Sequence, residues 1–117
     1  MLSRRIAMPA ALVAAGAALL APAADAGHSH VQKVTIASNF YAPFKATVTA
    51  GDRVRFKWQG GNFEFHDVNV RKGPTKFSSP LQAAGTWTTK KLVKPGTYRL
   101  FCSQHEEMTM TLVVKKR

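Results

Sequence analysis

Apolar and polar residues alternate with a period of two along most of the chain after residue 31. The alternation runs through segments separated by Gly, Pro, Asn and Asp turns: 34–36, 44–49, 54–58, 63–70, 98–102 and 108–114, with a further strand expected around Trp87 after Gly85. Short alternating segments separated by turns are typical of an antiparallel sandwich or barrel. No stretch after residue 31 sustains a helical period, and 76–84 is expected to be a loop. The pattern therefore predicts an all-β domain.

The N-terminal residues follow a different pattern. Met1–Arg5 carries two arginines, residues 6–20 are almost entirely apolar, and Ala24-Asp25-Ala26 has the form of a cleavage site. These parts are typical of a secretory signal peptide, and the apolar stretch is shorter than the about 20 residues of a membrane span. We expect residues 1–26 to be removed as a signal peptide, with an uncleaved anchor as the alternative. Residues 27–117 would then form a single domain in the periplasm or outside the cell.

The composition narrows the chemistry of this domain. The chain of 117 residues has 17 Lys and Arg against 6 Asp and Glu, a formal charge of +11, and one cysteine. A single cysteine excludes an intramolecular disulfide framework and a zinc site built from several cysteines. The few carboxylates argue against a calcium-loop protein. Small exported domains without disulfides often gain stability from a bound metal, so metal ligands are the next feature to seek.

One short segment near the C-terminus brings soft metal ligands together. Cys102, His105 and Met108 lie within seven residues, in an expected loop between two strands. A thiolate, an imidazole and a thioether suit copper, and a type 1 copper site needs a second histidine. His66 lies well inside a predicted strand and is the candidate for this fourth ligand. Each residue alone is more often part of a core, so it is their combination and spacing that indicate copper.

These residues give the chain a resemblance to the small type 1 copper proteins, or cupredoxins, in the branch of plastocyanin and amicyanin. The landmarks are the segment 51–58 (GDRVRFKW), His66-Asp67-Val68, Pro95-Gly96-Thr97-Tyr98, and Cys102-Ser103-Gln104-His105 leading into Met108. The resemblance covers the chain from about Val34 onward. It implies an eight-stranded Greek-key β-sandwich with one copper ion that cycles between Cu(I) and Cu(II). It also implies one-electron transfer and no enzymatic activity.

Two methionines are candidates for the weak axial ligand. Met108 gives the short spacing that is similar to amicyanin, and Met110 gives the longer spacing that is similar to plastocyanin. We expect Met108 to be the ligand, because Met110 is in phase with Leu112 and Val114 and fits a core position.

The resemblance also implies contacts around the ligands. The side chain of Asp67 is expected to bond near Ser103, which would tie the two ligand segments together. The backbone N–H of Asp67 is expected to point at the sulfur of Cys102. Two acidic residues beside the loop histidine, Glu106 and Glu107, are expected to favour Cu(II).

The basic surface is expected to steer the protein towards acidic partners. A redox protein with an acidic docking surface is the main candidate, and an anionic membrane surface or cell wall is another. Nucleic acid is not expected as a partner of an exported domain, and a monomer is expected.

Three other functions use the same residues differently. A copper chaperone or buffer outside the cytoplasm would have the same ligands. A nucleophile–base pair of Cys102 and His105 is less favoured, because no orienting acid or oxyanion motif accompanies it. A basic surface-binding module would hold copper only incidentally.

His28 and His30, at the expected new N-terminus, form a separate candidate chelate for Cu(II).

Overall fold

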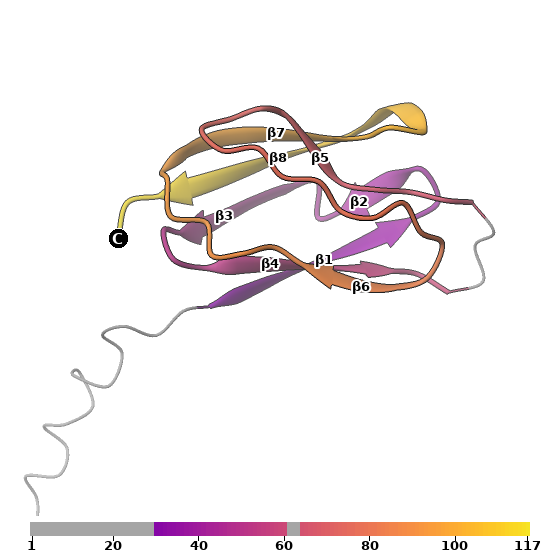
Figure 1. Cartoon of the computed structure of the whole chain (residues 1–117), viewed down its shortest axis with the longest axis horizontal. Helices are drawn as coiled ribbons and strands as arrows, with labels where there is room; N and C mark the ends of the chain where they lie inside the picture. The colour runs from indigo at the N-terminus through magenta and orange to yellow at the C-terminus, as the bar shows by residue number, and fades with distance from the viewer. Residues whose placement is uncertain (1–29, 61–63) are drawn as a thin grey trace, which may run out of the picture.

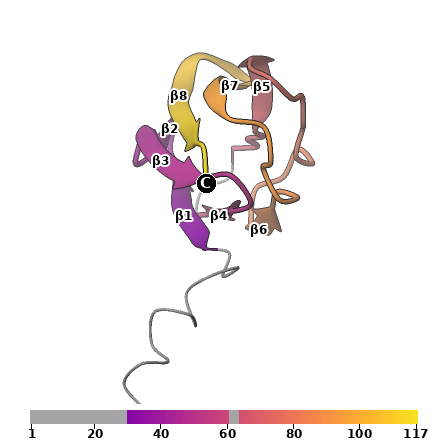
Figure 2. The ribbon, with the colours of Figure 1, turned by 90° about the vertical axis from the view of Figure 1, so that its left-hand side faces the viewer.

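The computed structural model describes residues 30–60 and 64–117, which form eight strands in two four-stranded sheets. The first sheet has the order β2-β1-β4-β6 and the second has the order β3-β8-β7-β5, and the two lie face to face (Figures 1 and 2). The strands are β1 (Val31–Ala37), β2 (Phe40–Ala42), β3 (Lys45–Thr49), β4 (Arg53–Trp58), β5 (Asn69–Lys72), β6 (Gly85–Thr88), β7 (Gly96–Cys102) and β8 (His105–Lys115). The predicted all-β class and eight-stranded sandwich are confirmed.

Some sequence predictions fall on other parts of the chain. The signal peptide expected at 1–26, His28, and the start of the strand expected at 63–70 lie outside the described residues. Within 30–60 and 64–117, no helix has the length and apolar character that crossing a membrane requires.

The sheets are mixed, whereas the alternation suggested antiparallel pairing throughout. β1 pairs in parallel with β4, and β3 pairs in parallel with β8. A parallel neighbour requires a crossover connection, and the chain supplies one between β1 and β4 by passing through β2 and β3. Alternation shows which face of a strand is buried, but it carries no information on the direction of the neighbouring strand, so the antiparallel expectation was wrong for these pairs.

The core forms where the inward faces of the two sheets meet. In β4 the residues Val54, Phe56 and Trp58 are buried and the residues between them are exposed, as the alternation predicts. Phe44 is different, because it is 72% exposed and precedes β3 instead of belonging to it. β2 was not predicted from the sequence, since three residues are too few to show a period, yet its Tyr41 is fully buried.

The turn between β7 and β8 lies at one end of the sandwich, and the C-terminus lies at the other (Figure 1). Asp52, in the turn between β3 and β4, belongs to the C-terminal end, because its carboxylate lies 3.9 Å from the guanidinium of Arg117. The β7–β8 end carries the predicted metal ligands.

Candidate metal centre

The structure brings His66, Cys102 and His105 together at the β7–β8 end. The Nδ1 atom of His66 lies 3.9 Å from the Sγ atom of Cys102. The imidazole rings of His66 and His105 lie 4.8 Å apart between centroids, at an interplanar angle of 43°. His66 and Cys102 are buried, whereas His105 is half-buried. Three of the four predicted ligands therefore form one cluster with one partly exposed edge.

His66 does not lie inside a strand, and this expectation was wrong. β5 begins only at Asn69, and His66 makes a single antiparallel bridge with Gln82. Its backbone N–H donates to the carbonyl of Gln82 at 2.9 Å and its carbonyl accepts from the N–H of Gln82 at 3.1 Å. The indole N–H of Trp58 also donates to the His66 carbonyl, at 3.0 Å. The segment is extended, so it alternates like a strand, but it pairs with a neighbour only locally.

The residues after His66 are held by two further side chains. The hydroxyl of Tyr41 donates to the backbone carbonyl of Asp67 at 2.7 Å, and the backbone N–H of Val68 donates to Ser79 Oγ at 2.8 Å. Burial raises the pKa of Tyr41 far above its usual range, with smaller contributions from Cys102 and Asp67, so its hydroxyl stays protonated as the donor. Sequence reasoning missed Tyr41 and Ser79, because only the tertiary fold shows that they support this segment.

The loop between Cys102 and His105 is a tight turn. Cys102 ends β7, His105 begins β8, and the two residues are paired, so Ser103 and Gln104 alone make the connection. The expected loop is thus shorter than the sequence suggested. The backbone N–H of Gln104 donates to the sulfur of Cys102 at 3.4 Å, and this bond orients the sulfur within the turn.

The expected contact between Asp67 and Ser103 is present. The carboxylate of Asp67 accepts hydrogen bonds from the backbone N–H and the hydroxyl of Ser103, each at 2.7 Å. Burial alone would raise the pKa of Asp67, but the bonds from Ser103, Asn69 and Cys102 outweigh it and lower this pKa. The contact expected between the Asp67 backbone N–H and the Cys102 sulfur stays a prediction.

The surroundings of His66 favour its neutral imidazole form. Burial lowers the pKa of His66, and the neighbouring His105 lowers it further, against smaller opposing effects of Glu64 and Asp67. Metals bind the neutral form of histidine, because the lone pair must be available. The buried position of His66 therefore prepares it to bind a metal.

Both methionines are buried and point to the same side of β8. The phase along the strand therefore does not distinguish Met108 from Met110. Their distance from the turn does, because a strand rises about 3.3 Å per residue and Met110 lies about 7 Å farther along than Met108. Met110 is also paired with Leu100 in the middle of β7, which fits a core position.

An additional carboxylate belongs to the cluster. Ligand atoms of Glu64, His66 and His105 lie within 4.8 Å of one another, although sequence reasoning did not include Glu64 in the site. A signal was present, because residues two apart in an extended segment share a side and Glu64 precedes His66 by two. Four of the five acidic residues in the described part of the chain lie within two residues of His66 or His105: Glu64, Asp67, Glu106 and Glu107.

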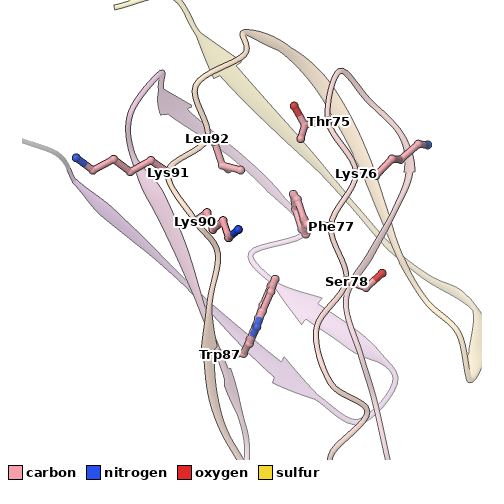
Figure 3. A pocket seen from close by; sticks show the side chains of 8 residues that line it. All are labelled: Thr75, Lys76, Phe77, Ser78, Trp87, Lys90, Lys91 and Leu92. Atoms are coloured by element: carbon pink, nitrogen blue, oxygen red, sulfur yellow. The ribbon is translucent and has the colours of Figure 1, made fainter.

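A separate pocket of about 390 Å³ lies elsewhere in the sandwich and contains none of the cluster residues (Figure 3). The rings of Phe77 and Trp87 lie 5.9 Å apart between centroids and form its apolar wall. Its lining consists of Thr75, Lys76, Phe77, Ser78, Trp87, Lys90, Lys91 and Leu92. The pocket brings no nucleophile or metal-binding histidine next to the cluster.

Comparison with known proteins agrees with this architecture. The family model described as a cupredoxin-like domain matches residues 9–114. A copper-containing nitrite reductase from Thermus scotoductus SA-01 is similar in structure, with 24% identity and a TM-score of 0.65 over 74% of this chain. An oxidised amicyanin variant is similar at 21% identity and a TM-score of 0.63, covering 73% of this chain and 82% of that chain. A reduced amicyanin variant is similar at 23% identity and a TM-score of 0.63, covering 80% and 89%.

The similar structures differ in the share of their own length that this chain covers. The chain spans only 22% of the nitrite reductase, so the similarity there concerns one part of a larger enzyme. No curated protein matches the chain. At these identities, the solved structures show the fold alone.

Proposed function

The chain belongs to the cupredoxin-like domain family, whose members bind one copper ion, and we propose that it is an exported type 1 copper protein that carries single electrons between redox partners. One observation carries the proposal: the Nδ1 atom of His66 lies 3.9 Å from the sulfur of Cys102, beside His105. Export is part of the proposal because residues 1–26 have the pattern of a signal peptide.

The residues at this end suit copper. We propose His66, Cys102 and His105 as the main ligands and Met108 as the weak axial ligand. Two imidazoles, one thiolate and one thioether form the donor set typical of a type 1 site, and the buried free thiol of Cys102 supplies the softest donor. Bound copper would supply the chemistry by exchanging one electron between Cu(I) and Cu(II).

The protein would assist electron transfer by holding the ligands in the same positions in both oxidation states of the metal. Buried His66 and Cys102 are kept away from water, and the Asp67–Ser103 hydrogen bonds join the segments that bear them. Ligands fixed by surrounding hydrogen bonds change geometry little when the metal changes charge. The half-buried His105 forms the accessible edge, and we propose it as the exit for the electron.

We propose a redox protein with an acidic docking surface as the partner. The outer face of β1 and β4 exposes Lys33, Arg55 and Lys57, with Lys33 directly beside Arg55 in the sheet. Four of the five carboxylates in residues 30–60 and 64–117 lie at the cluster instead. An acidic partner would therefore be attracted to this flank of the sandwich, while the His105 edge lies at the β7–β8 end.

We propose a carrier instead of an enzyme because the pocket lined by Phe77 and Trp87 contains none of the residues of the cluster. A copper chaperone or buffer would use the same ligands, so the test must separate retention of copper from its release. The protein is loaded with one copper, cycled electrochemically, and mixed with a copper chelator in each oxidation state. A carrier gives a reversible one-electron wave and keeps its copper in both states. Rapid loss of copper on reduction would contradict the carrier and favour the chaperone.

A further inference from the structure

We propose that Glu64 is an additional metal ligand of this centre and forms, with His66 and His105, a second ligand set for divalent ions such as Zn(II). The inference rests on the proposed function only in that the two ligand sets share both histidines. It concerns the exposed side of the cluster, where the carboxylate of Glu64 lies close to both histidines but has no role in the copper ligand set.

The geometry fits a small metal ion with little movement. One ligand atom from each of Glu64, His66 and His105 lies within 4.8 Å of the others. Tetrahedral zinc with bonds of about 2.1 Å holds its ligand atoms about 3.4 Å apart. The three atoms therefore need to approach by about 1.4 Å at most. Rotation of the exposed Glu64 side chain moves its carboxylate, and an adjustment of the half-buried His105 ring brings the two imidazoles closer.

The two ligand sets differ in hardness. Imidazole and carboxylate both serve as Zn(II) ligands in proteins. A thiolate and a thioether are softer donors, and they select Cu(I) although a thiolate also binds Zn(II). Cys102 is buried, and Glu64 is exposed. The histidines therefore have a soft donor available in the interior and a hard donor available at the surface.

This arrangement has a consequence for metal selection. A divalent ion arriving from solvent meets the exposed carboxylate of Glu64 and the half-buried His105 before it reaches the buried thiol. Zn(II) held there would block copper from the shared histidines. In the copper-loaded protein, the carboxylate would favour Cu(II) over Cu(I).

The first test measures Zn(II) binding by calorimetry in the protein without copper. Glu64→Gln should weaken Zn(II) binding by at least the about tenfold that losing an outer-shell partner of a metal site costs. Glu107→Gln is the matched control, because it removes the same charge two residues from His105. Equal Zn(II) affinities of the two variants would overturn the inference. Because a thiolate also binds Zn(II), both variants are measured with Cys102 and again in a Cys102→Ser background. The effect of Glu64→Gln should persist without the thiol, whereas the copper assignment depends on the thiol, so the two can fail separately.

A second test separates a direct ligand from a carboxylate that only contacts the outer N–H of a histidine. In a Cys102→Ser background, residue 64 is changed by Glu64→Cys and the protein is loaded with Co(II). A thiolate bound directly to Co(II) gives a charge-transfer band, and here it could come only from position 64. We expect this band, which would show that position 64 reaches the metal. Because cysteine is shorter than glutamate, the contradicting result is a Cys102→Ser protein whose Co(II) spectrum and affinity do not change with Glu64→Gln. If Cys102→Ser unfolds the chain, the Zn(II) comparison of Glu64→Gln with Glu107→Gln decides the question alone.

Discussion

The carboxylate of Asp67 accepts two hydrogen bonds of 2.7 Å from Ser103, one from its backbone N–H and one from its hydroxyl. The pair spans 36 positions of the sequence and connects the segment that bears His66 to the turn between Cys102 and His105. The first segment precedes β5 and the second joins β7 to β8, so the contact fixes their relative position. It is the most direct support for a ligand set that is held in place without metal.

Removing the hydroxyl of this pair should loosen the centre. Ser103→Ala deletes the bond to Asp67 Oδ2 but keeps the backbone bond, so the free energy of unfolding should fall by about 1 kcal/mol, within the range for one hydrogen bond. Ser103→Thr keeps a hydroxyl at an exposed position and is the control. Denaturant unfolding of the metal-free variants measures the difference. Equal losses in both variants would show that the hydroxyl bond is not responsible.

The two methionines should respond differently to one substitution. Met108→Leu should leave copper bound but shift the visible spectrum and the reduction potential, because the axial ligand tunes both. Met110→Leu, in the core, should cost less than about 1.5 kcal/mol and leave the spectrum unchanged. Optical spectra and voltammetry of both copper-loaded variants provide the measurement. The reverse pattern would assign the axial position to Met110.

The stability of the fold should depend on pH through Asp52, at the end of the sandwich opposite to the metal ligands. Its carboxylate accepts bonds from the backbone N–H of His30 at 2.9 Å and of Thr49 at 2.8 Å. Burial alone would raise its pKa, but these bonds, with the charges of His30 and Arg117, lower the pKa below the usual 3.8. A lowered pKa in the folded state means that the ionised carboxylate stabilises the fold above the unfolded-state pKa. This stabilisation disappears as the pH falls through the folded-state value.

Asp52→Asn should therefore destabilise the protein at neutral pH by more than it does in acid. The two bonds to a charged acceptor suggest a loss of roughly 1.5–3 kcal/mol at pH 7. The difference from the wild type should shrink as the pH drops below the ordinary pKa of 3.8. Chemical unfolding across this pH range is the measurement, with the exposed Glu106→Gln as control. A difference that does not change with pH would contradict the role of the Asp52 charge.

Electron transfer to an acidic partner should slow steeply as salt is added. The exposed cations Lys33, Arg55 and Lys57 act over distances that salt screens, with a screening length of about 10 Å at about 0.1 M. Stopped-flow rates between low and high salt test this. Arg55→Gln should lower the rate at low salt, whereas Lys116→Gln, at the C-terminal end, should change it little. A rate that is independent of salt would count against electrostatic steering.

The alternation of residues predicted the core of the fold well where one face of a strand is buried. β4 is the best example, because every inward residue from Val54 to Trp58 is buried. The parallel pairs and the short strand β2 could not be predicted, since both depend on the path of the chain between sheets. The alternation around His66 predicts a strand, but this extended segment pairs only locally, at Gln82.

The candidate site also has a part that the sequence predicts and a part that only the folded structure shows. Cys102, His105 and Met108 are close in the sequence, so their spacing alone suggested a copper site. The role of Tyr41 appears only after folding brings β2 to the segment that bears His66. The sequence gives one sign of Glu64, its place two residues before His66, but only the structure brings it close to His105 as well. Local sequence patterns thus identified the candidate copper ligands, and tertiary contacts identified the residues that position these ligands or add to them.

The central claim is tested most directly by adding Cu(II) to the purified protein and recording the visible spectrum. We predict an intense thiolate-to-copper charge-transfer band that saturates at one copper per chain and disappears in Cys102→Ser. His66→Gly should also weaken or shift the band, because it removes one of the two imidazoles beside the thiol. A wild-type protein without an intense band, or a Cys102→Ser protein that retains the same band, would contradict a type 1 copper centre at these residues.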